Sequence, residues 1–214
     1  MLGPMGFDHP IFSESLRLIE ASLPEGALQG LSVPERDVVL RLIHSSGDLS
    51  LITGVSFSRR ACELGVLSLS ARAPILTDTA MAAAAVAPMA RRTFGNLVRS
   101  VLDWAPEQAP EGGTRAAAGM FQALRCHPGA VVLIGSAPTA LELLLEQVRS
   151  RQVAPPALVI GMPVGFVGVA ESKAHLAASD LPQIRLDGSR GGAGLVGAVV
   201  NALLRRAWLE KAHG

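Results

Sequence analysis

Short apolar runs that end in polar residues or glycines recur along the chain and are typical of buried strands. The clearest lie at residues 131–135 and 158–161, and others are predicted at 73–78, 96–102 and 184–187. The two clearest runs are rich in β-branched residues, which suit the pleated surface of a sheet. The pattern therefore predicts a sheet that forms the centre of the molecule.

Stretches with apolar residues at helical spacing alternate with these strands. The spacing predicts helices at residues 10–21, 32–46, 57–69, 80–90, 140–149 and 193–206, with further helices that begin at 114 and 170. Between 131 and 161 a strand, a crossover helix and a second strand form a unit of the right-handed parallel type. The alternation predicts an α/β fold with three αβα layers and a mainly parallel central sheet. At this length we expect a single domain, residues 1–214.

Composition and charge argue against several classes of function. Hydrophobic residues make up 49% of the chain and charged residues 17%, which favours a large core and a buried surface between the subunits of a homodimer. The formal net charge of +1 creates no global field that would attract nucleic acid or a membrane surface. Cys62 and Cys126 lack metal-ligand spacing, so we expect two core thiols and no metal site. With no signal-peptide pattern and no run long enough to cross a bilayer, the sequence predicts a cytoplasmic protein.

The segment at residues 157–173 combines a buried strand, a glycine-rich turn and the start of a helix. Gly161, Gly165 and Gly168 follow the strand. Glycines let the backbone approach a ligand, and a helix N-terminus offers free N–H groups, which together favour a carboxylate or phosphate guest. Ordinary strand-to-helix turns also need glycines, so a purely structural role stays open. The spacing differs from Gly-x-Gly-x-x-Gly, which argues against a nucleotide-dependent oxidoreductase.

His44 is the candidate proton or hydrogen-bond donor. Ser32 and Glu35 have the spacing of a capping box, and Gly47 can take the left-handed C-cap conformation, so His44 falls in the last turn of its helix. The partial negative charge of a helix C-terminus predicts a raised pKa for the imidazole. Alternatively, His44 only caps the exposed carbonyls of that turn.

Other polar residues stand where strands end or helices begin, and each has a structural alternative. Thr77 and Asp78 end a strand, where sites gather in open α/β sheets, but Asp78 also suits the cap of the next helix. Ser136 and its neighbouring amides are candidate ligand contacts or a helix cap. Arg115 has the planar fork that binds a carboxylate, but arginines at helix starts are commonly solvated. Ser15 lies on the opening helix, where a hydroxyl commonly faces solvent.

The central segment Gly161-Met-Pro-Val-Gly-Phe-Val-Gly168, followed by Ala170-Glu-Ser-Lys173, resembles the signature of the precorrin-8X methylmutases, or precorrin isomerases, of cobalamin biosynthesis. Further blocks agree in their order along the chain. They lie at residues 11–19, 44–47, 73–78, 114–118, 134–141 and 191–192. The resemblance therefore spans nearly the whole chain, and the central segment is its most specific part.

The resemblance implies an isomerase that moves a methyl group from C-11 to C-12 of precorrin-8X to give hydrogenobyrinate, or that carries out the same methyl shift on cobalt-precorrin-8. This rearrangement occurs within the substrate, so no redox cofactor and no bound metal is implied. The implied partner is a tetrapyrrole, held by a homodimer with its pocket near the subunit boundary. His44 aligns with the histidine regarded as catalytic in the family, and the resemblance assigns Arg115 to a substrate carboxylate, in its own or the neighbouring subunit's pocket. The implied substrate-binding residues are Ser15, Thr77, Asp78, Arg115, Ser136, Gly161, Gly165, Lys173 and Arg190.

Two segments depart from the family pattern. Residues 81–90 are mostly alanine where relatives tend to carry a glycine and more polar residues. In the last glycine loop Ser189 occupies the place where the family usually has an arginine, and Arg190 follows it. These departures keep an alternative open, a carrier protein that binds a tetrapyrrole without rearranging it, although the intact His44 and Arg115 argue against it.

Overall fold

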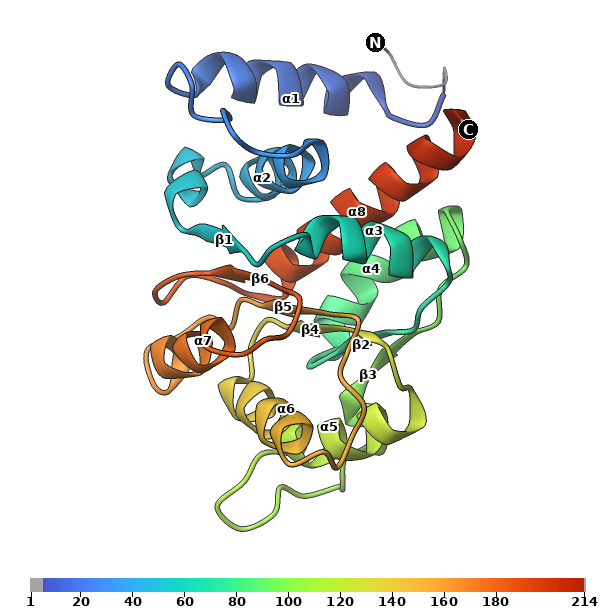
Figure 1. Ribbon diagram of the computed structural model, residues 1–214, viewed down its shortest axis with the longest axis vertical. Coiled ribbons are helices and arrows are strands. Elements are labelled where there is room, and N and C mark those ends of the chain that lie inside the picture. Colours follow the sequence, from blue (N-terminus) through green and yellow to red (C-terminus); the bar gives the residue numbers. More distant parts are fainter. Residues whose placement is uncertain (1–5, 214) are drawn as a thin grey trace.

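A mixed sheet runs through the middle of the computed structural model, which describes residues 6–213 (Figure 1). Within that range the sheet has six strands in the order β1-β6-β5-β4-β2-β3. They are β1 (Val55–Phe57), β2 (Ile75–Thr77), β3 (Val98–Ser100), β4 (Val131–Ile134), β5 (Leu158–Gly161) and β6 (Gln183–Leu186). All neighbouring pairs are parallel except β1 with β6. The mainly parallel sheet predicted from the sequence is confirmed.

Helices cover both faces of this sheet. One face carries α2 (Val33–Ser46), α3 (Ala61–Ser70), α4 (Ala80–Arg92) and α8 (Ala193–His213). The other carries α5 (Arg115–Cys126), α6 (Pro138–Arg149) and α7 (Val169–Ala177). The opening helix α1 (Pro10–Ser22) lies outside this arrangement, stacked on α2 at one end of the long axis (Figure 1). Two short 3₁₀ helices, η1 (Leu49–Thr53) and η2 (Val101–Trp104), complete the described elements.

The core follows from the apolar runs of the sequence. Every residue of β4 and β5 is buried, as expected for central strands that helices cover on both faces. The alanine-rich α4 packs closely against α8, where a Cβ built on Gly197 would lie 3.0 Å from the Cβ of Ala85. The small residues of α4 therefore serve close helix packing, which gives a structural reason for its unusual composition.

Three local predictions were wrong. Residues 57–69 were predicted as one helix, but the short edge strand β1 ends at Phe57 and α3 begins only at Ala61. Three residues carry too little periodicity to reveal a strand. The last helix extends beyond the predicted end at Arg206 and continues to His213. Cys62 is a core thiol as predicted, whereas Cys126 is exposed.

Candidate functional site

His44 lies in the last turn of α2, where the sequence places it. Glu35 accepts a hydrogen bond from the Ser32 N–H at 2.8 Å, and Gly47 ends the helix with a left-handed φ of 71°. His44 is exposed as a whole residue, but its ring packs against Phe12 of α1 and its Nδ1 lies 2.7 Å from Oγ of Ser15 on the same helix, so the ring is partly desolvated. Two helices thus bring together two residues that the sequence predicted for one site.

The charge state of His44 differs from the prediction. Burial, followed by the positive charge of Arg41, lowers the pKa of His44 below its ordinary value. The predicted rise in pKa, which rested on the helix C-terminus, is therefore wrong, because desolvation and a neighbouring cation act in the opposite direction. A neutral imidazole at pH 7 follows from this environment.

Arg41 was missed by the sequence reasoning. Its guanidinium lies 4.8 Å from the ring centroid of Phe12, and the same ring meets His44 edge-on at 5.0 Å. Within residues 6–213 Arg41 forms no ion pair, and its Nε is buried without a hydrogen-bond partner. Its position three residues before His44 on one helix, where side chains share a face, was the available signal.

The turns after β4, β5 and β6 interlock at the carboxyl edge of the sheet. Four backbone bonds join them: Met162 N–H to Ile134 O, Val164 N–H to Gly135 O, Gly165 N–H to Ser189 O and Gly192 N–H to Met162 O, at 2.9 to 3.1 Å. Gly191 lies so close to the Met162 carbonyl that any Cβ there would collide with it. The three glycine-rich turns therefore form one unit.

Asp78 fills the turn after β4 with the protein's own carboxylate. Its Oδ2 accepts hydrogen bonds from the N–H groups of Gly135, Ser136 and Ala137 at 3.0, 2.6 and 2.8 Å. Asp78 is fully buried, and this burial raises its pKa although the three N–H donors oppose the rise. Thr79, not Asp78, caps α4. Asp78 thus shapes this turn, and an incoming anion would have to displace it from these amides.

Thr77 and Ser136 differ in their access to solvent. Thr77 is fully buried, and its hydroxyl donates to the Thr79 carbonyl at 2.8 Å. Ser136 is exposed at the carboxyl edge of the sheet. Only the second side chain is open to a ligand in this conformation.

The glycines of the signature segment are favoured at their positions for different structural reasons. A Cβ on Gly161 would collide with Leu176, so this glycine lets α7 pack on β5. Gly165 and Gly168 have positive φ values of 136° and 69°, which favour glycine at both positions. Gly168 also begins α7 without a side-chain cap, which leaves the first-turn N–H groups open to an anion.

The tip of the signature loop is apolar and exposed. Phe166 is 93% exposed and Val167 88%, directly before the uncapped start of α7. Exposed apolar side chains beside open N–H groups suit a ligand or partner that offers both apolar surface and negative charge.

Lys173 is buried, with 3% of its surface exposed. Its Nζ donates to the carbonyl oxygens of Gly188 at 2.6 Å and Arg190 at 2.7 Å. Burial lowers its pKa to about 8; the nearby Asp187 opposes this shift and Arg190 adds to it. The ammonium group predicted to bind substrate thus holds the loop between β6 and α8.

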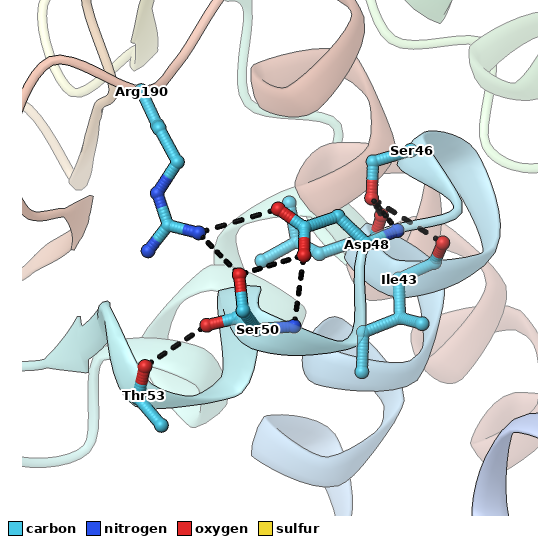
Figure 2. A network of polar contacts seen from close by, with 7 residues as sticks. Ile43, Ser46, Asp48, Ser50, Thr53 and Arg190 are labelled. Carbon is cyan, nitrogen blue, oxygen red and sulfur yellow. Dashed lines mark hydrogen bonds and ion pairs between the residues drawn. The ribbon is translucent and has the colours of Figure 1, made fainter. Parts of the chain in front are cut away.

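Arg190 extends from that loop toward the end of α2, as Figure 2 shows. Its Nη1 lies 2.8 Å from Oγ of Ser50 and 3.3 Å from Oδ2 of Asp48. Hydrogen bonds from Ser50, and then the charge of Arg190, hold the pKa of Asp48 below its ordinary value. Asp48 and Ser50 carried no functional signal in the sequence, because only folding brings them to residue 190.

Arg115 stands apart from this cluster. It is the exposed first residue of α5, and its Nε donates to the Pro106 carbonyl at 3.0 Å. Figure 1 places α5 toward the opposite end of the long axis from α1 and α2. Within one chain, the arginine predicted to hold a carboxylate therefore lies far from His44.

A wide groove of about 1340 Å³ borders the N-termini of α5, α6 and α7. Thr114, next to Arg115, is one of its lining residues, and an ion pair between His175 and Glu142 spans α7 and α6 at 2.8 Å. Two residues that the sequence offered as candidate ligand contacts, Thr139 and the turn residue Gly168, line this groove, whereas His44 and Ser15 do not. The residues around His44 and the groove are separate features of the chain.

The described residues contain no group of three or more histidine, cysteine, aspartate or glutamate side chains that could hold a metal ion. The same part of the chain has no helix that could span a membrane.

Comparison with known proteins gives a consistent result. A family model described as precorrin-8X methylmutase matches residues 10–206. The cobalt-precorrin-8 methylmutase of Synechocystis is 35% identical, over 95% of this chain and 98% of the relative. The precorrin-8X methylmutase of Pseudomonas aeruginosa is 39% identical, over 90% of this chain and 93% of the relative. A solved structure of precorrin-8X methylmutase from Thermus thermophilus has a TM-score of 0.79 and 38% identity, and covers 92% of this chain and 95% of that one.

Proposed function

The chain belongs to the precorrin-8X methylmutase family, and from this premise we propose that it moves a methyl group from C-11 to C-12 of precorrin-8X or cobalt-precorrin-8. The bond from the methyl carbon to C-11 breaks as its bond to C-12 forms, so the reaction changes no atom count and no net oxidation state. It is an isomerisation in cobalamin biosynthesis, for which we expect a cytoplasmic location. The Ser15–His44 pair is the observation that carries this proposal.

His44 polarises the ring. We assign the tautomer in which the Ser15 hydroxyl donates to Nδ1, so that Nε2 carries the proton. With its pKa lowered, the imidazole then acts as a neutral hydrogen-bond donor to a ring nitrogen beside the migrating methyl group. This bond draws electron density toward the acceptor carbon and stabilises the transition state.

Several of the other predicted residues orient the macrocycle. Ser136, Gly161 and Gly165 lie on the carboxyl edge of the sheet, where Asp78 supports the turn after β4. The open N–H groups at the start of α7 and the exposed guanidinium of Arg190 supply binding groups for side-chain carboxylates of the substrate.

The first experiment follows the visible spectrum of precorrin-8X with the wild type, His44→Gln and His44→Ala. The wild type is expected to convert the substrate, and both variants are expected to bind it with little turnover, because the polarising hydrogen bond alone contributes about a hundredfold. Binding by all three proteins without conversion, on the cobalt-containing substrate as well, would instead establish a carrier. Turnover at the wild-type rate in His44→Gln would remove His44 from the mechanism.

The active unit is a homodimer in which Arg115 of one subunit serves the site of the other. Arg115 begins α5 and His44 lies near the end of α2, two helices that lie toward opposite ends of the long axis (Figure 1), while apolar side chains are exposed on α1 and α2. Ile11 on α1 is 73% exposed and Val33 on α2 is 59% exposed. Such surface is commonly covered by a partner.

Mixing two inactive variants tests this arrangement. His44→Ala and Arg115→Ala are each expected to be inactive alone, whereas mixed dimers contain one site with both residues intact. After subunit exchange, the mixture should recover about a quarter of wild-type activity, because half of the dimers are mixed and each has one intact site of two. Analytical ultracentrifugation supplies the control for assembly. Exchanged dimers without recovered activity would place Arg115 outside the partner's site.

A further inference from the structure

The backbone between β6 and α8 is held along its length by groups from other elements. Lys173 binds the carbonyls of Gly188 and Arg190, and the Gly165 N–H binds the carbonyl of Ser189. On the other side, Gly192 donates to Met162. Three consecutive carbonyls are therefore fixed, while the side chain of Arg190 extends away from this loop (Figure 2).

The loop after α2 is the target of that side chain. Asp48 Oδ1 accepts hydrogen bonds from the backbone and hydroxyl of Ser50, which begins η1 as a compact turn. The Asp48 N–H donates to Oγ of Ser46, which in turn donates to the Leu42 carbonyl at 2.9 Å. Asp48 is thereby tied to the last turn of α2, the turn that carries His44 (Figure 2).

We propose that Lys173 is a positioning residue, which acts through Arg190 and Asp48 to fix the end of α2, and with it His44, against the glycine-rich turns. This inference rests on the proposed function and adds residues to it. Lys173 itself touches no substrate in this arrangement. Its ammonium sets the backbone from which Arg190 reaches Asp48 and Ser50, and a small displacement of a catalytic group is costly in rate.

The choice of residue supports this role. Lys173 and Lys211 are the only lysines in a chain that otherwise uses arginine for its cations. A compact ammonium with three donors suits two carbonyl oxygens in a confined space, whereas the wide planar guanidinium of arginine does not. A group meant to grip a flexible ligand would not need this burial.

The contacts that run from Lys173 through Arg190 to Asp48 form a relay. A double-mutant cycle between Lys173→Met and Asp48→Asn tests this relay, because each of the two residues contacts Arg190. Each substitution is expected to lower kcat by about tenfold to a hundredfold, with a smaller rise in KM where Arg190 loses its contact with a substrate carboxylate. The double variant should be no slower than the slower single variant, since both break one chain of contacts. The proposal would be overturned if the kcat losses of the two single variants multiplied in the double variant. It would also be overturned if either single variant kept the wild-type kcat, or if the main effect were a rise in KM. Lys211→Met, which removes the exposed lysine of α8, should behave as wild type.

Hydrogen exchange on the substrate-free protein supplies a second readout that needs no turnover. In Lys173→Met, amides at residues 44–52 should exchange faster, and in Asp48→Asn those at residues 186–192, while α5 stays unchanged. If Lys173→Met does not fold, Asp48→Asn carries this test alone, because its side chain is 44% exposed. The relay would be contradicted if amide hydrogen exchange stayed at the wild-type rate in residues 44–52 of Lys173→Met, or in residues 186–192 of Asp48→Asn. Faster exchange in these remote segments, in a protein that shows no methylmutase activity, would contradict the proposed function. The contacts from Lys173 through Arg190 to Asp48 would then still hold the end of α2.

Discussion

At the scale of single residues, the ring of Phe12 contacts His44 edge-on and two arginines at the same time. Arg41 lies 4.8 Å and Arg205 5.6 Å from its centroid. Arg205 is bound by the carboxylate of Asp8 in two places, whereas Arg41 forms no ion pair within residues 6–213. The positive charge of Arg41 therefore adds to burial, the larger cause, in lowering the pKa of His44.

Replacement of Arg41 by methionine is expected to raise the pKa of His44. The substitution removes the cation but keeps an apolar side chain against Phe12. Titration of the imidazole by NMR measures the pKa directly, and the pH below which kcat/KM falls should move upward with it. Arg36→Met is the matched control, because Arg36 lies on the same helix and is paired with Glu20 at 2.8 Å. An unchanged pKa in Arg41→Met would contradict this assignment.

The sequence predicted the position of His44 but not its electrostatics. Capping residues fix where a helix ends, so the last turn of α2 could be located from Ser32, Glu35 and Gly47. Burial and the effect of Arg41 depend on how α1 packs over α2, which no local pattern shows. The same limit applies to Asp78, whose three backbone donors come from a segment nearly sixty residues further along the chain.

At the scale of elements, the glycine-rich turns contact one another and the helix that follows β5. Gly191 contacts the Met162 carbonyl and Gly161 contacts Leu176, so both glycines are needed for packing. Sequence reasoning correctly predicted strand, turn and helix at each place. It left ligand approach and a purely structural role open for the glycines, because a local pattern cannot distinguish a nearby ligand from a nearby backbone.

Two glycine-to-alanine substitutions distinguish a glycine that is needed for close packing from one that only adds backbone flexibility. Gly191→Ala is expected to lower the free energy of unfolding by more than about 2 kcal/mol, because its Cβ would overlap backbone atoms that cannot move independently. Gly194→Ala, three residues away in α8 with open space around its Cβ, should be neutral or stabilising by up to about 1 kcal/mol. Urea unfolding measures both values. Equal effects of the two substitutions would show that the interlocked turns are loosely packed.

At the scale of the whole molecule, Lys173 links the stability of the fold to pH. Its pKa is lowered from 10.5 to about 8, so between these values the folded chain has released a proton that the unfolded chain still binds. The unfolded state binds more protons in this window, and the contribution of Lys173 to stability therefore rises with pH. This contribution is smallest below pH 8 and complete above pH 10.5.

Comparison of wild type with Lys173→Met isolates this contribution from that of other titrating groups. Between pH 8 and pH 10.5 the wild type should gain about 1 to 3 kcal/mol of unfolding free energy relative to the variant. Asp187 and Arg190 face the amine and remain in both proteins. Parallel stability curves over this range would show that Lys173 titrates as an ordinary surface lysine.

The peripheral place of α1 has a consequence for the lifetime of the site. None of its residues, all of which are described, is buried, and its principal neighbour is α2. Helices with few buried contacts open locally at a cost well below that of global unfolding. The Ser15–His44 bond persists only while α1 is docked, so the fraction of molecules with an oriented imidazole equals at most the docked fraction. In the mechanism proposed above, the population of competent enzyme is therefore limited by the docking equilibrium of the first helix.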